Sequence, residues 1–564
     1  MTALGIARSS VIEVAPSLKL SPKRAIAASV PQRPPLPALL AAHPSVTALL
    51  AGLASAVGLA PLSLWPITLL CLTLLILLLQ ASQGRRHAFL LGWLFGVGHF
   101  AAGLNWIAHA FTYQDAMPHW FGYGAVVLLS LYLAVYPGLA TLIAWEGARR
   151  LPPPRRVNGR VPRVSAALSL LLGASWIGTE YLRATLFTGF AWNPLGIIWL
   201  PTSLAHSATL VGTYGLSGLA IVAAGALHLA LGRRIGSALA MALPLAGAAA
   251  IGLLWSSFTV LPPARQTAPA IRIVQPNIGQ DVKYSPAMEA TNFGKLASLS
   301  GAAEPRSRLI FWPEAAIPAW LDMEPQWRAR LASLLGPGDL LLTGGEKVYF
   351  EDRTVNGYTS QVLSGAHNSL WIVDARARLL GRYDKAHLVP YGEYLPMRQL
   401  LTPLGLSRLV PGDVDFWPGP GARSLPLPAG TGRPPLKMGV QICYEIIFSG
   451  HVVDQANRPD FIFNPSNDAW FGRWGPPQHL AQARLRAIEE AIPVIRSTPT
   501  GISALVDAQG RIVDSLPHRT AGFIDALLPP PGGRTLFSRV GNWAALALML
   551  ALVALAVATR RNRH

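Results

Sequence analysis

The feature that most constrains the fold of this chain is a series of apolar stretches, each long enough to cross a lipid bilayer. A membrane-spanning helix needs roughly 17 to 25 mainly apolar residues. The 564 residues hold eight stretches of about this length, near 43–60, 62–80, 87–110, 121–146, 164–184, 206–231, 235–257 and 543–559. Hydrophobic residues make up 51% of the chain and charged residues only 13%, a balance too apolar for an ordinary soluble protein. We therefore predict a polytopic α-helical membrane protein with about eight transmembrane helices.

A block of mixed polarity, from about residue 268 to 530, separates the seventh apolar stretch from the eighth. Short β-type runs alternate in it with helical stretches, which is typical of an α/β sandwich with catalytic groups at the ends of its strands. The expected strands are 270–274, 308–312, 340–343, 369–373, 437–442, 460–463 and 501–506. The expected helices are 287–299, 326–335 and 478–490. The block is therefore predicted to be a folded domain outside the membrane.

The net charge of +19 comes from arginine and lysine residues that are unevenly distributed. They cluster in the N-terminal tail and in every second connection between apolar stretches, at 85–86, within 149–163, at 233–234 and within 560–563. Because cytoplasmic loops of membrane proteins carry an excess of basic residues, both termini should be cytoplasmic and the 268–530 block should lie on the outer side. The positive charge is thus a topology signal, and we expect no nucleic-acid partner.

The chain is expected to divide into four parts. Residues 1–36, rich in Ser, Pro and Ala, should form a disordered cytoplasmic tail, because no apolar core directly follows their early charges. Residues 37–260 should form a membrane domain with seven transmembrane helices, and residues 261–535 the outer domain. Residues 536–564 should hold the C-terminal transmembrane helix and a basic cytoplasmic tail.

One cysteine of the outer block is a candidate nucleophile. Cys443 follows the mainly apolar run 438–442, whereas the chain's other cysteine, Cys71, lies inside an apolar stretch. The two are therefore not expected to form a disulfide, and the chain has no CxxC pair to bind a metal. A lone cysteine at a strand end indicates a nucleophile, but a buried cysteine that packs as a small hydrophobe explains the same pattern.

A glutamate and a lysine upstream have chemistry that such a cysteine needs. Glu314 comes where the expected strand 308–312 meets a turn, and Lys385 lies in the dense polar and aromatic run 383–396. A thiol must lose its proton before it attacks a carbonyl carbon. A glutamate can take that proton, and a lysine can stabilise the thiolate and the developing oxyanion. We therefore expect Glu314, Lys385 and Cys443 to converge in space, with Glu314 as the base.

These residues and their surroundings resemble a known superfamily. The order Glu, Lys, Cys is similar to that of the nitrilase, or carbon–nitrogen hydrolase, superfamily, whose fold is an αββα sandwich. A domain of this kind between seven spans and a last one resembles the apolipoprotein N-acyltransferases, and the resemblance covers nearly the whole chain after residue 40. The signatures that carry it are Trp312-Pro313-Glu314, the run from Tyr383 to Pro396, Cys443-Tyr444-Glu445 and Asn467-Asp468-Ala469-Trp470-Phe471-Gly472.

The resemblance implies roles for ten residues. Those implied in catalysis are Glu314, Lys385 and Cys443, with Glu393, Tyr444 and Glu445 in support. Those implied in substrate binding are Trp470, Tyr284, Trp192 and Tyr391. Two positions depart from the family's pattern: Tyr284 stands where a tryptophan of a mobile loop is expected, and Ala191 replaces a proline before Trp192. Anchoring at the membrane interface explains the aromatic residues there equally well.

The implied reaction is a two-step acyl transfer. Cys443 would take the sn-1 acyl chain of a phospholipid such as phosphatidylethanolamine as a thioester. The α-amino group of a diacylglyceryl-cysteine at the N-terminus of an apolipoprotein would then attack it. The resemblance further implies a bacterial inner (cytoplasmic) membrane protein with its catalytic domain on the periplasmic side. This chemistry needs no metal or organic cofactor, and we expect a monomer.

Three other functions stay open at this point. A membrane-tethered amidase of the nitrilase type would pass its acyl group to water instead. A non-catalytic membrane scaffold or transporter could carry an inactive nitrilase-like domain. A cysteine–histidine hydrolase would use His387 or His451 as its base, with Glu314 an ordinary loop residue.

Overall fold

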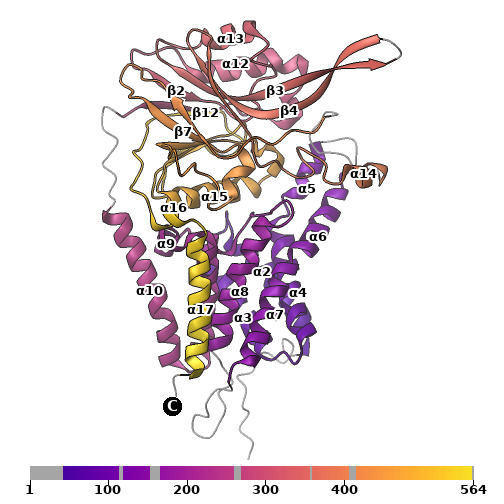
Figure 1. Ribbon diagram of the computed structural model, residues 1–564, viewed down its shortest axis with the longest axis vertical. Coiled ribbons are helices and arrows are strands. Elements are labelled where there is room, and N and C mark those ends of the chain that lie inside the picture. The colour runs from indigo at the N-terminus through magenta and orange to yellow at the C-terminus, as the bar shows by residue number, and fades with distance from the viewer. Residues whose placement is uncertain are drawn as a thin grey trace, which may run out of the picture. The chain divides into compact units, whose positions relative to one another are not determined.

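The structure is a computed structural model that describes residues 42–113, 118–152, 166–258, 268–355, 358–404 and 414–561 (Figure 1). The predicted disordered tail, 1–36, lies outside these residues. Apolar helices form both ends of the described chain, and a two-sheet α/β domain forms its middle. The apolar helices are α2 (Pro44–Ser55), α3 (Trp65–Gln80), α4 (Arg85–Gly103), α5 (Ile107–Ala110), α6 (Phe121–Leu133), α7 (Val135–Arg150), α8 (Ala166–Thr185), α9 (Ala208–Leu231), α10 (Ile235–Phe258) and α17 (Trp543–Arg561).

The predicted number of membrane spans is only partly supported. Among the residues described, the segments long and apolar enough to cross a membrane are Phe121–Arg150, Ser203–Leu231, Ile235–Leu254 and Trp543–Arg560. Helices α4 and α5, with the turn after them, make a fifth span if the pair, bent by 48°, is counted as one. Helices α2 and α3 are apolar but shorter. Each predicted stretch contains a helix, but the count of eight transmembrane helices is not confirmed.

The middle domain contains two six-stranded sheets. Their strand orders are β12-β1-β2-β3-β4-β5 and β11-β10-β9-β8-β7-β6. The bounds are β1 (Ala270–Gln275), β2 (Arg308–Phe311), β3 (Leu340–Val355), β4 (Tyr358–Asp374), β5 (Leu379–Asp384), β6 (Ser424–Leu427), β7 (Leu436–Val440), β8 (Phe461–Pro465), β9 (Val494–Ser497), β10 (Ala504–Val506), β11 (Ile512–Ser515) and β12 (Gly522–Leu527). Strands β1, β2 and β3 run parallel to one another, as do β7, β8 and β9.

Alternate residues of the strands pack on opposite sides of each sheet. Leu309 and Phe311 of β2 face the apolar core between the sheets, while Ile310 lies in the core under α12 (Glu289–Ser300) and α13 (Pro325–Ala332). The outer side of the second sheet packs against α15 (Gly475–Glu490), through residues such as Val494. The layers are therefore α, β, β, α, which confirms the predicted nitrilase-like α/β fold (Figure 1). The remaining short helices are α11 (Gln280–Lys283), α14 (Arg398–Leu401) and α16 (Leu536–Val540).

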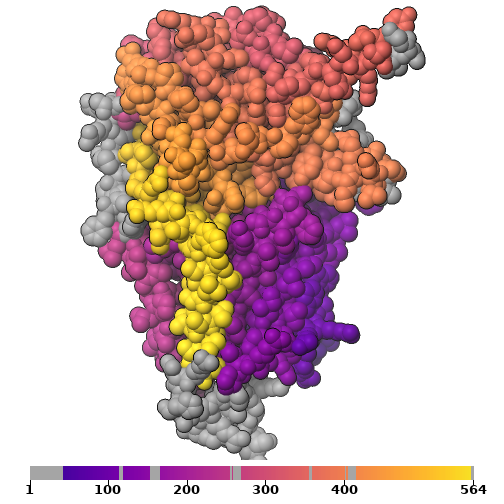
Figure 2. Space-filling model, in the orientation of Figure 1, coloured from indigo at the N-terminus to yellow at the C-terminus, as the bar shows by residue number. Residues whose placement is uncertain are grey.

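The largest difference from the predicted elements is the hairpin of β3 and β4. The two strands pair antiparallel from Leu340 with Asp374 to Val355 with Tyr358, whereas the sequence predicts only 340–343 and 369–373. Figures 1 and 2 show the outer part of this hairpin projecting from the domain. Its side chains are largely exposed on both faces, so no alternation of apolar and polar residues marks it as a strand.

Buried polar contacts join the α/β domain to the apolar helices. Helix α9 is broken at Gly212, where φ is +67°. The backbone N–H of Thr213, directly after the break, donates to Oε1 of Glu489 on α15 at 2.6 Å. A carboxylate at the start of a helix satisfies free N–H groups and is favoured by the helix dipole. A side chain of the domain thus caps a helix of the apolar part.

Candidate active site

Glu314 lies just beyond β2, on a tight turn. The residue is 6% exposed, and the next residue, Ala315, has a φ of +45°. Gly344 of β3 lies directly against this turn: a Cβ there would be 2.3 Å from the backbone nitrogen of Ala315. A residue without a side chain is therefore required at position 344 for the turn to carry Glu314 inward.

Lys385 directly follows β5 and points into the interior. Its backbone N–H donates to the carbonyl oxygen of Asn368 at 2.9 Å, and its own carbonyl accepts from the N–H of Gly419 at 2.8 Å. Both backbone groups are thus paired, and only 1% of the residue is exposed. A buried lysine without a compensating charge would be strongly unfavourable. The groups around its ammonium group therefore decide whether Lys385 can stay charged in the interior.

Cys443 begins the turn that follows β7 and has a φ of +51°. Its side chain is 5% exposed and belongs to the core between the sheets. Its carbonyl oxygen accepts from Asn464 Nδ2 at 3.3 Å and from His479 Nε2 at 3.0 Å. A left-handed conformation at a non-glycine residue costs about 1–3 kcal/mol and persists only where neighbouring contacts enforce it. The nucleophile candidate is therefore held in a strained turn.

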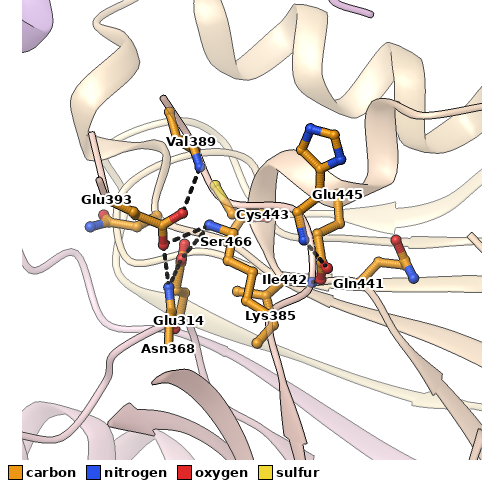
Figure 3. A network of polar contacts seen from close by, with 12 residues as sticks. Glu314, Asn368, Lys385, Val389, Glu393, Gln441, Ile442, Cys443, Glu445 and Ser466 are labelled. Carbon is orange, nitrogen blue, oxygen red and sulfur yellow. Dashed lines mark hydrogen bonds and ion pairs between the residues drawn. The ribbon is translucent and has the colours of Figure 1, made fainter. Parts of the chain in front are cut away.

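The three side chains meet, together with Glu393, in one buried polar cluster (Figure 3). Lys385 Nζ lies 3.0 Å from Oε1 of Glu393 and 3.4 Å from Oε1 of Glu314. Figure 3 shows the thiol of Cys443 beside this ammonium group, and the charges of Glu314 and Lys385 both act on it. Among the residues that the structure describes, Oε2 of Glu314 has no hydrogen-bond partner. The cluster therefore combines a thiol, an ammonium group and a carboxylate oxygen that can accept a proton.

Burial and charge set the protonation of this cluster. Burial raises the pKa of the Cys443 thiol well above its usual value, and Glu314 raises it further, while Lys385 and the backbone N–H of Asn467 lower it. Burial also disfavours the charged form of Lys385, but Glu393 and Glu314 outweigh it and its pKa is raised. At neutral pH the cluster therefore holds a thiol and an ammonium group, so the thiol needs a base before it can attack.

Asn368 belongs to the cluster but is missed by the sequence reasoning. It lies on β4, and its Nδ2 donates to Oε1 of Glu314 at 2.7 Å and to Oε1 of Glu393 at 2.9 Å. One amide group thus holds the two carboxylates in positions from which both contact Lys385. The only signal in the sequence is a polar residue directly before the expected strand 369–373.

Glu445 ties the segment after Lys385 to the turn of Cys443. Its Oε1 accepts from the backbone N–H of Ala386 at 2.7 Å, and its Oε2 accepts from that of Ile442 at 2.7 Å. The side chain is buried. Because one carboxylate bonds to both segments, it fixes the spacing between the ammonium group and the thiol.

A pocket adjoins the cluster on the Glu314 side. Its lining includes Glu314, Lys283, Tyr284, Ile278, Phe293 and Trp327, but neither Lys385 nor Cys443. Lys283 Nζ donates to the backbone carbonyl of Glu314 at 3.0 Å, and burial lowers the pKa of this lysine to about 8. Tyr284, predicted to bind substrate, is about half exposed in the pocket wall.

Comparison with known families decides what kind of protein carries this cluster. Residues 51–226 match the apolipoprotein N-acyltransferase N-terminal domain, and residues 270–534 match the carbon-nitrogen hydrolase family. The apolipoprotein N-acyltransferase of Rhodopseudomonas palustris is 35% identical over 92% of this chain and 95% of its own length. That of Caulobacter vibrioides is 38% identical over 89% and 92%. The chain belongs to the apolipoprotein N-acyltransferase family.

The assignment to the apolipoprotein N-acyltransferases confirms the predicted resemblance. It rests on the two matched segments and on relatives that align over nearly the whole chain. A solved structure of a nitrilase-superfamily member, Nit3 of Saccharomyces cerevisiae, overlaps 47% of this chain and 93% of its own with 19% identity and a TM-score of 0.31. The relatives, not this overlap, carry the assignment.

The other predicted substrate-binding residues of this N-acyltransferase differ in how far they are exposed. Tyr391 is 46% exposed on the loop after β5. Trp470 is half-buried, and its Nε1 donates to the side-chain oxygen of Asn467 at 3.1 Å once that amide is oriented to face its donors. Trp192 is fully buried, and its Nε1 donates to Gln478 at 3.0 Å. Trp192 thus has the placement of a packing residue and presents no surface to a ligand in this conformation.

Two residues near the cluster face the apolar part instead of the thiol. The hydroxyl of Tyr444 donates to the carbonyl of Gly189 at 3.4 Å, and Nε2 of His387 donates to the carbonyl of Thr188 at 3.0 Å. His451 is exposed. These placements give no support to a histidine base at Cys443, and they make Tyr444 a contact between the two parts of the chain.

We expect Glu445→Gln to change how stability depends on pH. Burial raises the pKa of Glu445 to about 7 from the ordinary 4.5, so between these values the folded protein holds a proton that the unfolded chain has lost. The free energy of unfolding of the wild type should therefore fall as the pH rises through this window, by roughly 3 kcal/mol at most. The variant should lack this part of the fall.

The measurement is the difference in Tm between Glu445→Gln and the wild type in detergent, at pH 5 and at pH 7.5. The difference should move in favour of the variant at the higher pH. Asp514→Asn, which alters an exposed carboxylate, serves as the control. A difference that is the same at both pH values would contradict the prediction.

Proposed function

We propose that this chain transfers the sn-1 acyl chain of a phospholipid, such as phosphatidylethanolamine, to the α-amino group of the N-terminal diacylglyceryl-cysteine of an apolipoprotein, the last step of lipoprotein maturation. Cys443 is the nucleophile, Glu314 the general base and Lys385 the oxyanion stabiliser. The observation that carries the proposal is their buried cluster, with one unpaired oxygen of Glu314, in a chain whose relatives are named apolipoprotein N-acyltransferases.

In the first half-reaction Cys443 becomes acylated. Glu314 Oε2 accepts the thiol proton while Sγ attacks the carbonyl carbon of the sn-1 ester. The Lys385 ammonium group stabilises the negative charge that develops on the carbonyl oxygen of the ester. When the tetrahedral intermediate collapses, the bond to the glycerol oxygen breaks and Glu314 returns the proton to that oxygen. The products are a thioester on Cys443 and a lysophospholipid.

In the second half-reaction the thioester is consumed. The neutral α-amino group of the acceptor attacks the thioester carbon, and Glu314 takes the proton that the nitrogen loses. Collapse breaks the C–S bond, and the proton passes to the departing sulfur. An amide forms and the free thiol is restored, so no cofactor is consumed. Glu393, Glu445 and Tyr444 support this chemistry by holding Lys385, the Cys443 turn and the apolar part in place.

The proposed location is the bacterial inner membrane, with the α/β domain on the periplasmic side. The clustering of arginine and lysine in alternate connections supports this orientation. The proposal includes the predicted eight membrane spans, with a membrane domain of residues 37–260, a catalytic domain of 261–535 and a terminal span in 536–564. The protein is proposed to be a monomer. Tyr284, Tyr391 and Trp470, which have accessible surface, are the proposed contacts for lipid, and Trp192 is proposed to act on substrate only through packing.

Mass spectrometry of the intact protein tests the proposal. The purified full chain is incubated with phosphatidylethanolamine of one defined acyl chain and then with a diacylglyceryl peptide that has a free N-terminus. We expect a mass increase of one acyl chain that hydroxylamine removes, followed by its transfer to the peptide. Loss of the adduct to water at the same rate without the peptide would favour the amidase alternative. No adduct on a folded protein would favour the scaffold.

A further inference from the structure

A buried histidine that takes no part in the proposed proton transfers holds the backbone of Cys443. His479 lies on α15, is 0% exposed, and its Nε2 is 3.0 Å from the Cys443 carbonyl oxygen. A carbonyl oxygen can only accept, so Nε2 must carry the hydrogen. The other donor to this oxygen, Asn464 Nδ2, is more distant at 3.3 Å. His479 therefore makes the shorter of the two contacts to the carbonyl of the strained residue.

The ring of His479 is itself held by two fully buried charges. Nδ1 of the ring lies 2.9 Å from Oδ1 of Asp468 and 3.0 Å from Nη2 of Arg496, and Nη2 lies 2.6 Å from Oδ2 of Asp468. A carboxylate can only accept and a guanidinium group can only donate, so these two contacts hold Nδ1 in place, and Nε2 faces the Cys443 carbonyl oxygen, to which it must donate. Burial and the charge of Arg496 lower the pKa of His479, while Asp468 acts in the opposite direction. The orientation in which Nε2 bonds to Cys443 is thus fixed by the contacts at Nδ1.

The same ring also packs against the apolar part of the chain. The ring centroids of His479 and Trp192 are 5.1 Å apart. Trp192 is positioned on both sides: its Nε1 donates to Gln478, the neighbour of His479, and its carbonyl accepts from Arg183 of α8 at 2.9 Å. A contact therefore leads from α8 through Trp192 to His479 and on to the carbonyl of Cys443.

We propose that His479 is a positioning residue for the nucleophile, and that Trp192 keeps its ring in place from the apolar part. The inference rests on the proposed role of Cys443. Without the donor at Nε2, the strained turn loses its shorter tether and can relax toward a negative φ, which displaces Sγ from Glu314 and Lys385. A displacement of about 1 Å can slow a reaction roughly 100-fold. Binding of the lipid should be affected far less than the chemical step.

Three variants of the full-length protein test this proposal. His479→Gln keeps an N–H donor at about the reach of Nε2, whereas His479→Asn is polar but too short, and His479→Leu has no donor. The control is His228→Asn, which alters a buried histidine of α9 that bonds to Gln80. The rate of acyl-adduct formation on Cys443 is measured by quenched mass spectrometry over a range of phosphatidylethanolamine concentrations, with Tm recorded for each variant.

We expect the maximal rate of His479→Asn to fall roughly 100-fold with the half-saturating lipid concentration unchanged, and His479→Gln to stay within about threefold of the wild type. His479→Leu replaces the asparagine variant if the latter does not fold. A folded variant without the donor that acylates at the wild-type rate would overturn the inference, as would a glutamine variant as slow as the asparagine one. A wild type that forms no adduct would overturn the proposed function as well, which separates the two failures.

Discussion

Replacing Cys443 with alanine should abolish the hydroxylamine-labile acyl adduct and all transfer to the lipoprotein peptide. The thioester can form only on a thiol, and removal of the nucleophile from another enzyme that forms an acyl intermediate costs about 10⁶-fold in rate. The fold should survive, because alanine has the same Cβ as cysteine and adds no strain at the φ of +51°. Activity is followed as acyl transfer to the peptide, and the adduct by intact mass spectrometry.

Cys71→Ala is the matched control for this experiment. Cys71 is also buried and unpaired, but it lies on α3, in the apolar part. We expect this variant to form the adduct and transfer it at the wild-type rate, with a similar small loss of stability. An adduct that persists in Cys443→Ala, or that disappears in Cys71→Ala, would place the acyl group elsewhere and contradict the proposed mechanism.

The ends of apolar strands explain why the main site residues could be predicted. Glu314 follows β2, Lys385 follows β5 and Cys443 comes soon after β7, and each is a chemically active residue at the end of a hydrophobic run. Strand ends of an α/β sandwich are where such residues gather. The separations of these residues in the sequence do not predict distances between their side chains. The contacts of 3.0 and 3.4 Å at Lys385 Nζ are known only from the structure, in which the strands are paired into sheets.

Asn368 and His479 could not be found in this way. Asn368 contacts Glu314 only because β3 lies between β2 and β4 in the first sheet. Local composition does not predict the order of strands in a sheet. His479 sits 36 positions after Cys443, on a helix whose small and polar residues resemble those of any amphipathic surface helix. Its burial depends on the apolar part covering α15, which is a property of the whole chain.

For the fold, too, the sequence predicts local features but not those that depend on the whole chain. The apolar runs identify the buried ends of β3 and β4 but not their exposed outer halves, because backbone pairing, and not burial, forms the hairpin there. Apolar composition identifies the helices of the membrane part, yet α2 and α3 are shorter than a typical span. A helix of this kind can rely on its neighbours to cover its ends, which composition alone does not reveal.

Glu314→Gln should separate proton transfer from electrostatics at the thiol. The amide is nearly the same size as the carboxylate and can still accept from Asn368, and Lys385 keeps its 3.0 Å contact with Glu393. It cannot accept the thiol proton, so adduct formation from phosphatidylethanolamine should slow by about 10²- to 10⁴-fold. Because the charge of Glu314 helps to raise the pKa of Cys443, its removal should increase the thiolate fraction. Alkylation of Cys443 by a small uncharged reagent should therefore become faster at the same pH.

The opposite signs of these two effects make the assignment of the base testable. If Glu314 acted only through its charge, both acylation and alkylation would become faster, and if its loss merely disrupted the site, both would become slower. Glu351→Gln, on the exposed hairpin, should change neither rate.

Glu393→Gln removes a carboxylate whose two oxygens are already bonded to Lys385, Asn368 and the backbone N–H of Val389. It should therefore slow acylation through Lys385 without the gain in alkylation, since its charge is not among the main influences on the thiol. Slower acylation with faster alkylation in Glu314→Gln alone is the result that a general base at position 314 requires.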